Sequence, residues 1–331
     1  MIKVVVDLYG GDYSPEETLK GAVLAVERDT DLKVVLCGEK EKILTLLSEK
    51  SSDSRIEILD APDVITNDDD PVSAVRFKKN SSLIAGIDYL SANDDAKGFV
   101  STGSSGAVLS AAVLLSKRIK GVNRPALAPV LPTVVKGKQV ILIDCGVNTE
   151  PKANNLLQFA QMGVGYAKLL GVNNPKVGLL SNGVEDKKGN TLTKEAFLLL
   201  KESNLDFVGN VEAREILSGA VDVLVSDGFS GNIALKACEG TALSMFSLIK
   251  EGIMQGGLRA KIGYLMLKPV LKNIKHTMDY NEYGGAVLVG LEKVIVKAHG
   301  SSKANAVANA ILQVKNLAEK NLPAFIAREI Q

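Results

Sequence analysis

The residues with the clearest capacity for chemistry lie in the stretch 221–240, VDVLVSDGFSGNIALKACEG. Its first five residues form a β-branched run typical of a buried strand, and a glycine-rich turn then leads into an apolar-periodic run typical of a helix. Such a turn points unpaired backbone N–H groups at one place, where the helix dipole also favours negative charge. It therefore predicts an anion site, although any parallel α/β protein needs turns of this kind. The candidate phosphate-binding residues are Asp227, Gly228, Ser230 and Gly231, and the candidate catalytic amide is Asn232.

Similar polar, glycine-bearing loops follow several other predicted strands. In open α/β sheets the carboxyl ends of parallel strands share one edge, and ligands bind in the crevice there. We therefore expect these loops to meet at one site. Their candidate substrate-binding or phosphate-binding residues are Asp7, Gly10, Gly11, Asp12, Ser101, Gly103, Ser104, Gly106, Asn148 and Asn182.

Three further side chains are candidates for catalysis. Lys187 and Lys188 lie in the polar loop that follows the predicted strand 177–180, and His299 is one of two histidines. Ammonium groups are suited to binding phosphate or an oxyanion, and histidine changes its charge near neutral pH. The alternatives are that the two lysines are solvated surface charges and that His299 is a packed, hydrogen-bonded side chain.

The carboxylates and cysteines give weaker signals. Asp7, Asp12 and Asp227 are potential metal ligands, but lone carboxylates on separate loops more often fix loop geometry, so we predict no metal and no other cofactor. The three cysteines have no metal-like or redox spacing, which fits a reducing cytoplasm. Cys145 follows a predicted strand, and we favour a small buried hydrophobe over a nucleophile there.

Strands alternate with helices along most of the chain, which predicts an α/β fold with a doubly wound, mostly parallel sheet. No linker, repeat or low-complexity tract divides the chain, so we expect a single domain over residues 1–331. The predicted strands are 2–6, 32–36, 56–59, 98–100, 140–143, 177–180, 221–225 and 294–296. The predicted helices are 16–27, 72–89, 107–115, 152–170, one from 191 and one from 301 or 302 to 318.

A helical hairpin is predicted to interrupt this alternation at residues 241–278. Apolar residues recur at helical spacing on both sides of a break at Gly256-Gly257, and Pro269 is expected to end or kink the second helix. The apolar positions exceed a single core-facing stripe, so we predict that the hairpin meets a second subunit and a membrane. The alternative is that it packs on its own sheet. The basic residues expected to meet anionic headgroups are Arg259, Lys261, Lys268 and Lys272.

Overall composition is that of an ordinary globular protein, with 46% hydrophobic and 23% charged residues. A net charge of +1 and the absence of Trp argue against a nucleic-acid surface. The first residues enter a predicted strand directly, so we expect no leader, and the uncharged run 98–116 is too rich in serine for a membrane helix. We expect a cytoplasmic protein. An exposed basic cluster at 117–124 is a candidate contact for an acidic partner.

Eight motifs occur in order along the chain: GGD at 10–12, STGSSGA at 101–107, RPA at 124–126 with LPT at 131–133, EDKKG at 185–189, GNVE at 209–212, DGFSGN at 227–232, YGGA at 283–286 and AHGSS at 298–302. Together they resemble the bacterial PlsX family of phosphate acyltransferases, which are enzymes of phospholipid synthesis. Each motif alone is weak, but eight in the same order are specific. The chain departs from the family pattern at Leu8-Tyr9, Ser104-Ser105 and Ser181-Asn182.

The resemblance implies that acyl-[acyl-carrier-protein] and inorganic phosphate are converted to acyl phosphate and free carrier protein. It also implies a fold similar to isocitrate and isopropylmalate dehydrogenases, a homodimer, and peripheral association with the inner face of the cell membrane. The residues agree with this chemistry: phosphate is already a nucleophile, so no Ser-His-Asp arrangement is needed, and the sequence offers none. The site must instead hold phosphate beside the thioester carbonyl and stabilise the oxyanion.

Two other classes of function remain open from the sequence. One is a phosphotransacetylase using coenzyme A or a nicotinamide-dependent dehydrogenase, because one fold serves several functions. No G-x-G-x-x-G motif follows a strand, which argues against the dehydrogenase. The other is a non-catalytic membrane adaptor that binds carrier protein through the basic hairpin.

Overall fold

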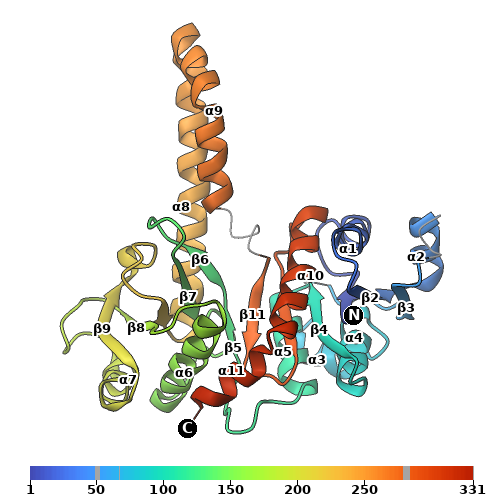
Figure 1. The fold of residues 1–331 in the computed structure, drawn as a ribbon, viewed down its shortest axis with the longest axis horizontal. Helices are drawn as coiled ribbons and strands as arrows, with labels where there is room; N and C mark the ends of the chain where they lie inside the picture. Colours follow the sequence, from blue (N-terminus) through green and yellow to red (C-terminus); the bar gives the residue numbers. More distant parts are fainter. Residues whose placement is uncertain (49–52, 67, 279–283, 331) are drawn as a thin grey trace.

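The computed structural model describes residues 1–48, 53–66, 68–278 and 284–330, which fold into two β-sheets covered by helices (Figure 1). Within these residues, the larger sheet has seven strands in the order β3-β2-β1-β4-β12-β11-β5, and the smaller has five in the order β6-β7-β10-β8-β9. The strands are β1 (Ile2–Asp7), β2 (Leu32–Gly38), β3 (Ile56–Asp60), β4 (Ala96–Ser101), β5 (Ala126–Ala128), β6 (Val130–Pro132), β7 (Gln139–Ile143), β8 (Lys176–Ser181), β9 (Asp206–Glu212), β10 (Val223–Val225), β11 (Ala286–Val289) and β12 (Val294–Lys297).

The predicted α/β class and mostly parallel pairing are confirmed, but the strands form two sheets rather than one. Among the described strands, antiparallel pairing is confined to β11 with β12, β11 with β5, and β6 with β7. Pro129 alone separates β5 from β6, which lie in different sheets. A proline has no N–H to donate to a ladder, so the chain leaves one sheet and enters the other at this residue.

Two apolar cores cover opposite faces of the strands. Val4 and Val6 of β1 belong to one core and Val5 to the other, because successive side chains of a strand point to opposite faces. In the second sheet, Ile143 belongs to the first core and Leu142 to the second. Each core therefore continues from one sheet to the other, which supports the single-domain organisation that we retain as a prediction.

Most predicted helices are found, with one division and two additions. The predicted helix 72–89 is two helices, because Ser81 starts a new one by accepting a hydrogen bond from the Ile84 N–H at 3.4 Å. Helices α2 and α11 were not predicted. The helices are α1 (Glu16–Arg28), α2 (Lys40–Leu47), α3 (Pro71–Phe77), α4 (Ser82–Ala92), α5 (Ser105–Leu115), α6 (Ala153–Leu169), α7 (Thr191–Glu202), α8 (Gly228–Gln255), α9 (Gly257–Met278), α10 (Ala304–Glu319) and α11 (Leu322–Glu329), with a 3-10 turn at Ala213–Glu215.

The hairpin is formed by α8 and α9, which project together from the body of the protein (Figure 1). Its first arm begins at Gly228, directly after β10, rather than at residue 241, so one helix of 28 residues links the cavity described below to the tip. Pro269 lies within α9 and does not end it. The buried residues of α8 lie no further along than Leu235, so the alternative that the hairpin packs on its own sheet is wrong. Among the described helices, none is both long and apolar enough to cross a membrane.

Candidate active site

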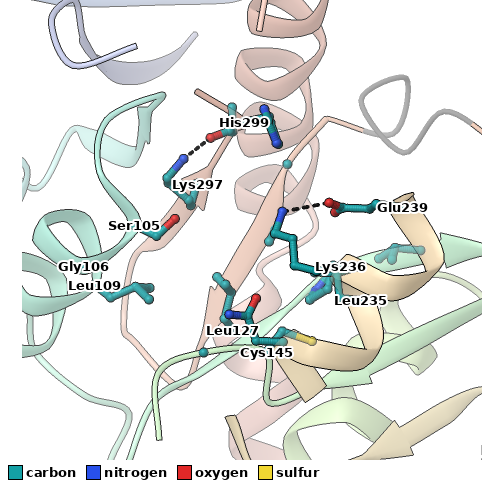
Figure 2. A pocket seen from close by; sticks show the side chains of 17 residues that line it. Ser105, Gly106, Leu109, Leu127, Cys145, Leu235, Lys236, Glu239, Lys297 and His299 are labelled. Carbon is teal, nitrogen blue, oxygen red and sulfur yellow. Dashed lines mark hydrogen bonds and ion pairs between the residues drawn. The ribbon is translucent and has the colours of Figure 1, made fainter. Parts of the chain in front are cut away.

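A cavity of about 230 Å³ is lined by residues from both sheets (Figure 2). The larger sheet contributes the end of β12, the beginning of α5 and part of β5, and the smaller contributes β6, the loop after β7 and the first turns of α8. The carboxyl ends of parallel strands therefore meet at this point, as the loop pattern predicted. The lining includes Ser105, Gly106, Leu109, Leu127, Val130, Cys145, Asn232, Leu235, Lys236, Glu239, Lys297 and His299.

Two lysines give the cavity a cationic end. Lys236 on α8 pairs with Glu239 one turn further on, with Nζ 2.7 Å from Oε2. Lys297 ends β12 and is only 9% exposed, and its Nζ donates to the carbonyl of Ala298. Burial, and next the charge of Lys236, lower the pKa of Lys297 to about 8. The positive potential of the cavity therefore comes from both sheets.

His299 lies beside these lysines and is half-buried (Figure 2). Its Nδ1 accepts a hydrogen bond from the Ser301 N–H at 3.2 Å, which places the proton of the neutral ring on Nε2. Burial, and next the charge of Lys236, lower the pKa of His299. The neutral imidazole is therefore the favoured form, and its Nε2–H is a potential hydrogen-bond donor.

Asp7 anchors the loops after β1 and β4. Its buried carboxylate accepts hydrogen bonds from the hydroxyls of Ser82 and Ser101, each at 2.6 Å, and from the Tyr9 N–H at 3.2 Å. Burial raises the pKa of Asp7 to about 6, while the three donors and the charge of Lys297 oppose that rise. These partners make Asp7 a loop anchor, which is the structural role that the sequence left open.

Glycines bring the loops after β1, β4 and β12 into contact. Gly10 has a φ of +110°, and a Cβ there would lie 2.8 Å from the Cα of Gly103. A Cβ on Gly11 would overlap a threonine hydroxyl of the same neighbouring loop. The Asp12 N–H donates to the Gly300 carbonyl at 2.8 Å. These three loops therefore form one wall around the end of β12.

Asn148 joins the loop after β7 to the start of α8. The buried Asp144 carboxylate accepts hydrogen bonds from the Asn148 N–H at 2.7 Å, from its Nδ2 at 2.9 Å and from the Leu127 N–H at 2.9 Å. Burial raises the pKa of Asp144. The Asn148 carbonyl in turn accepts from the Gly228 N–H at 2.7 Å. Asn148 thus holds the helix in place and is not among the residues lining the cavity.

The sequence predicted that free backbone N–H groups at the start of α8 bind an anion, and this prediction is wrong because those groups already have acceptors within the protein. The Gly228 N–H is bonded to the loop after β7, and the N–H groups of Phe229 and Ser230 donate to the Asp227 carboxylate at 3.0 and 2.8 Å. The Gly231 N–H donates to the Asp227 carbonyl at 2.9 Å. All four of these backbone N–H groups therefore donate to Asp227 or to the loop after β7, and none is left for an anion.

Helix α5 instead presents donors to the cavity. Ser105 and Gly106 line it, and within the described structure their N–H groups have no hydrogen-bond acceptor. Ser104 stands at the N-cap but makes no side-chain cap bond, and its carbonyl accepts the first helical bond from Val108 at 2.9 Å. The Gly103 N–H is held by the Ser101 hydroxyl at 3.0 Å. The polar edge of the cavity thus includes a helix N-terminus, although not the one predicted.

Two of the four predicted catalytic residues line the cavity, namely Asn232 and His299. Lys187 and Lys188 are exposed in the loop after β8 and are not part of its lining. That loop closes on itself, since the Asn182 Oδ1 accepts from the Gly189 N–H at 2.9 Å. A role for the two lysines in binding phosphate stays a prediction.

Sequence reasoning missed Lys236, Glu239 and Lys297. A signal existed for the first two, which follow Asn232 by four and seven residues and so lie on the same face of a helix. Lys297 is the charged last residue of an apolar strand. The sequence pattern predicted a strand over 294–296, which leaves Lys297 in the loop that leads to His299 and gives it no role.

Comparison with known proteins places this chain in a family. The family described as a fatty acid synthesis protein matches residues 2–325. The chain is 46% identical over 335 residues to the phosphate acyltransferase of Bacillus licheniformis, covering 100% of this chain and 98% of that protein. It is 47% identical over 324 residues to the phosphate acyltransferase of Leuconostoc mesenteroides, covering 97% of this chain and 94% of that protein.

Solved structures of lower identity share the fold. A phosphotransacetylase from Streptococcus pyogenes superposes with a TM-score of 0.63 at 18% identity, covering 96% of this chain and 94% of that one. The 4-hydroxythreonine-4-phosphate dehydrogenase from Klebsiella pneumoniae superposes with a TM-score of 0.53 at 12% identity, covering 96% of this chain and 98% of that one. The fold alone thus spans acyl transfer and dehydrogenation, whereas the full-length relatives are more specific. On those relatives, the chain belongs to the phosphate acyltransferase family.

Proposed function

We propose that the protein transfers a fatty acyl group from acyl-[acyl-carrier-protein] to inorganic phosphate, giving acyl phosphate for phospholipid synthesis, in the cavity between α5, α8 and β12. One observation carries this assignment of the site: the same cavity has a cationic end and an apolar wall. Phosphate suits the first, and the beginning of an acyl chain suits the second. The apolar wall is formed by Leu109, Leu127, Val130 and Leu235.

The reaction needs placement and charge stabilisation more than a strong base. An oxygen of phosphate forms a bond to the thioester carbonyl carbon, the carbonyl becomes a tetrahedral oxyanion, and its collapse breaks the C–S bond. The sulfur leaves as a thiolate and takes up a proton to become the free thiol of the carrier. The Asn232 amide lines the cavity and is the candidate donor to the oxyanion or phosphate. The neutral His299 ring is a candidate hydrogen-bond donor to the same oxygens, and the leaving thiolate takes its proton from water.

The carrier protein is proposed to approach over α8 rather than over the basic cluster 117–124. The Lys117 carbonyl accepts from the Glu292 N–H at 3.0 Å, just before β12 begins, whereas the cavity lies where β12 ends. The cluster and the cavity are also at opposite ends of α5, which spans about 16 Å. The basic residues of the hairpin are therefore the better candidates to attract an acidic carrier.

The proposed function is tested by mixing the protein with long-chain acyl carrier protein and phosphate and trapping acyl phosphate with hydroxylamine. We expect hydroxamate that depends on both enzyme and phosphate, after subtraction of direct thioester aminolysis in a phosphate-free control. Parallel reactions with acetyl coenzyme A and with nicotinamide cofactors separate the related activities. Product only from acetyl coenzyme A, or a change in nicotinamide absorbance without hydroxamate, would replace the proposal, and binding of carrier protein without any product would favour an adaptor.

We further propose that the hairpin pairs with a second subunit to make a homodimer and rests on the inner face of the cell membrane. Both arms expose apolar side chains that no described part of the chain covers, among them Leu243 at 70%, Leu248 at 68% and Leu265 at 67%. The exposed bases Arg259, Lys268 and Lys272 suit anionic headgroups, and the Lys261 side chain lies outside the described residues.

Replacing Leu265 and Leu267 with Glu is expected to abolish sedimentation with anionic vesicles while turnover on soluble acyl carrier protein is retained. Two carboxylates would be repelled by the headgroups and would remove apolar area from the interface. The matched control is Leu198→Glu on α7, which is 60% exposed but distant in sequence from the hairpin. Unchanged vesicle binding would exclude the membrane contact, and an unchanged sedimentation coefficient in solution would exclude these residues from the dimer contact.

A further inference from the structure

Lys297 is a buried cation that has no counter-ion among the described residues. Its side chain is as buried as that of Lys315, each at 9% exposure, yet the two have opposite surroundings. The Lys315 Nζ lies 2.9 Å from Asp29 and 2.8 Å from Glu319. The Lys297 Nζ has the Ala298 carbonyl as its sole hydrogen-bond acceptor among the described residues, and no described carboxylate is within ion-pair distance. Buried lysines are normally paired, so this one is short of a partner.

The two ends of β12 show how unusual this is. Lys293 lies just before the strand, and all of its hydrogen-bond donors have acceptors. Its Nζ donates to the carbonyls of Leu90, Asn93 and Ala96 at 2.7, 2.6 and 2.9 Å. An ammonium group has three donors, so Lys293 has used all of them. Lys297, at the other end of the strand, has used one and faces the cavity with the others. Lys293 therefore holds three backbone carbonyls together, whereas Lys297 has donors left for a ligand.

The charges around Lys297 define which ligand fits. Lys236, on the facing helix, lines the same cavity, and its charge acts against the protonated form of Lys297. Asp7 and Asp12 act in the opposite direction, but Asp7 is committed to its hydroxyl and N–H donors. Lys236 is ion-paired with Glu239, which also lines the cavity, so the two ammonium groups and the one carboxylate leave a net positive charge. Together with the open N–H groups of the α5 N-terminus, this charge favours an anion as the ligand.

We propose that Lys297 is a catalytic residue that binds the inorganic phosphate and holds it at the start of α5, opposite Lys236. This role rests on the proposed function for the identity of the reaction. The phosphate is assigned here to the buried Lys297 ammonium, which belongs neither to the eight sequence motifs nor to the strand–turn–helix stretch 221–240. In the bound state the phosphate supplies the counter-ion that the described part of the chain does not. The nucleophile is then fixed next to the apolar wall where the acyl carbonyl enters.

The test compares Lys297→Met and Lys297→Gln with the wild type. The Gln variant removes the charge but keeps a polar side chain with N–H donors, although it is one bond shorter than lysine, and the Met variant has a similar length without any donor. We expect both variants to raise the KM for phosphate by about tenfold to a hundredfold, the size of a lost charge-assisted hydrogen bond, and to leave the KM for acyl carrier protein little changed. The matched control is Lys293→Met, which is expected to lower the unfolding temperature and leave the phosphate KM unchanged, because it removes the donors to the three backbone carbonyls.

A pH series provides a readout that a structural lysine would not move. The folded-state pKa of Lys297, at about 8, lies below the usual lysine value, so the ammonium is present below that pH and is lost above it. Relative to the Lys297 variants, the wild type is expected to lose its advantage in phosphate KM as pH rises through 8. For the same reason, removing the charge is expected to leave the unfolding temperature at neutral pH equal or higher.

Phosphate binding without an acyl donor separates this proposal from the proposed function. Phosphate titrated against chloride at matched ionic strength should raise the unfolding temperature of the wild type and have a smaller effect on both Lys297 variants. If the wild type forms acyl phosphate and Lys297→Gln has an unchanged phosphate KM, the proposal is wrong and the function stands. If the wild type forms no acyl phosphate but phosphate still stabilises it through Lys297, the function is wrong and the anion site stands.

Discussion

Replacing Asn232 with Ala is expected to lower turnover by about a hundredfold or more while the protein remains folded. Asn232 lines the cavity from the first turns of α8, beside the loop after β7, where a Cβ on Gly146 would lie 3.9 Å from its amide carbon. Its side chain is exposed in the cavity and makes no hydrogen bond to any described residue, so the amide donors are available to a reacting oxygen. Removing one such donor costs about 3 to 4 kcal/mol of transition-state stabilisation.

The neighbouring Ile233→Ala variant is the matched control, because Ile233 is 54% exposed and is not part of the cavity lining. It changes the same helical turn without touching the site. Hydroxamate formation at saturating acyl carrier protein and phosphate gives the turnover, and circular dichroism reports the fold. Near-normal turnover of Asn232→Ala would remove the residue from the site, and an equal loss in Ile233→Ala would assign the effect to the helix.

Local sequence patterns predicted eight of the twelve described strands, because a β-branched run followed by glycine and polar residues is a property of a few adjacent residues; β5, β6, β9 and β11 were not predicted. Val223–Val225 and Val294–Lys297 are strands for this reason. Asn232 lies in the helix that follows the first of them, and His299 lies in the loop that follows the second. The sheet assignment was not predictable in the same way. The division at Pro129 depends on which strands lie beside β5 and β6, and those partners are distant in sequence.

The choice of anion-binding helix also depended on long-range contacts. The DGFSGN motif looks like a set of free N–H groups, but the Gly228 donor is taken by a carbonyl of Asn148, which arrives from another strand. The loop before Ser105 looks similar in sequence, yet its first donors stay open. Lys297 also depends on long-range contacts, because it stands out only by having no ion pair within the described structure, and a missing partner can be recognised only after the neighbours are placed.

A second large effect is expected from Gly231→Ala, which we predict to destabilise the protein by about 3 kcal/mol and to lower turnover by about a hundredfold. A Cβ at Gly231 would overlap the backbone carbonyl oxygen of Asp144 and would lie 3.3 Å from the Cβ of Ser226. The Asp144 carbonyl is a backbone group and the Ser226 Cβ is fixed to the backbone, so neither can rotate away as the end of a flexible side chain would. The start of α8 must therefore move away from the loop after β7, and it takes the next residue, Asn232, with it.

Gly240→Ala on the same helix is the matched control, because a Cβ at Gly240 has nothing within 4 Å among the described atoms. Replacing a helical glycine with alanine in open space stabilises a helix by up to about 1 kcal/mol, so the two variants should differ in the sign of their effect on urea unfolding. Activity measured well below the unfolding midpoint then separates displacement of Asn232 from loss of folded protein. If Gly231→Ala unfolds with the wild type and keeps its turnover, the close packing of α8 on the Asp144 loop does not position the site.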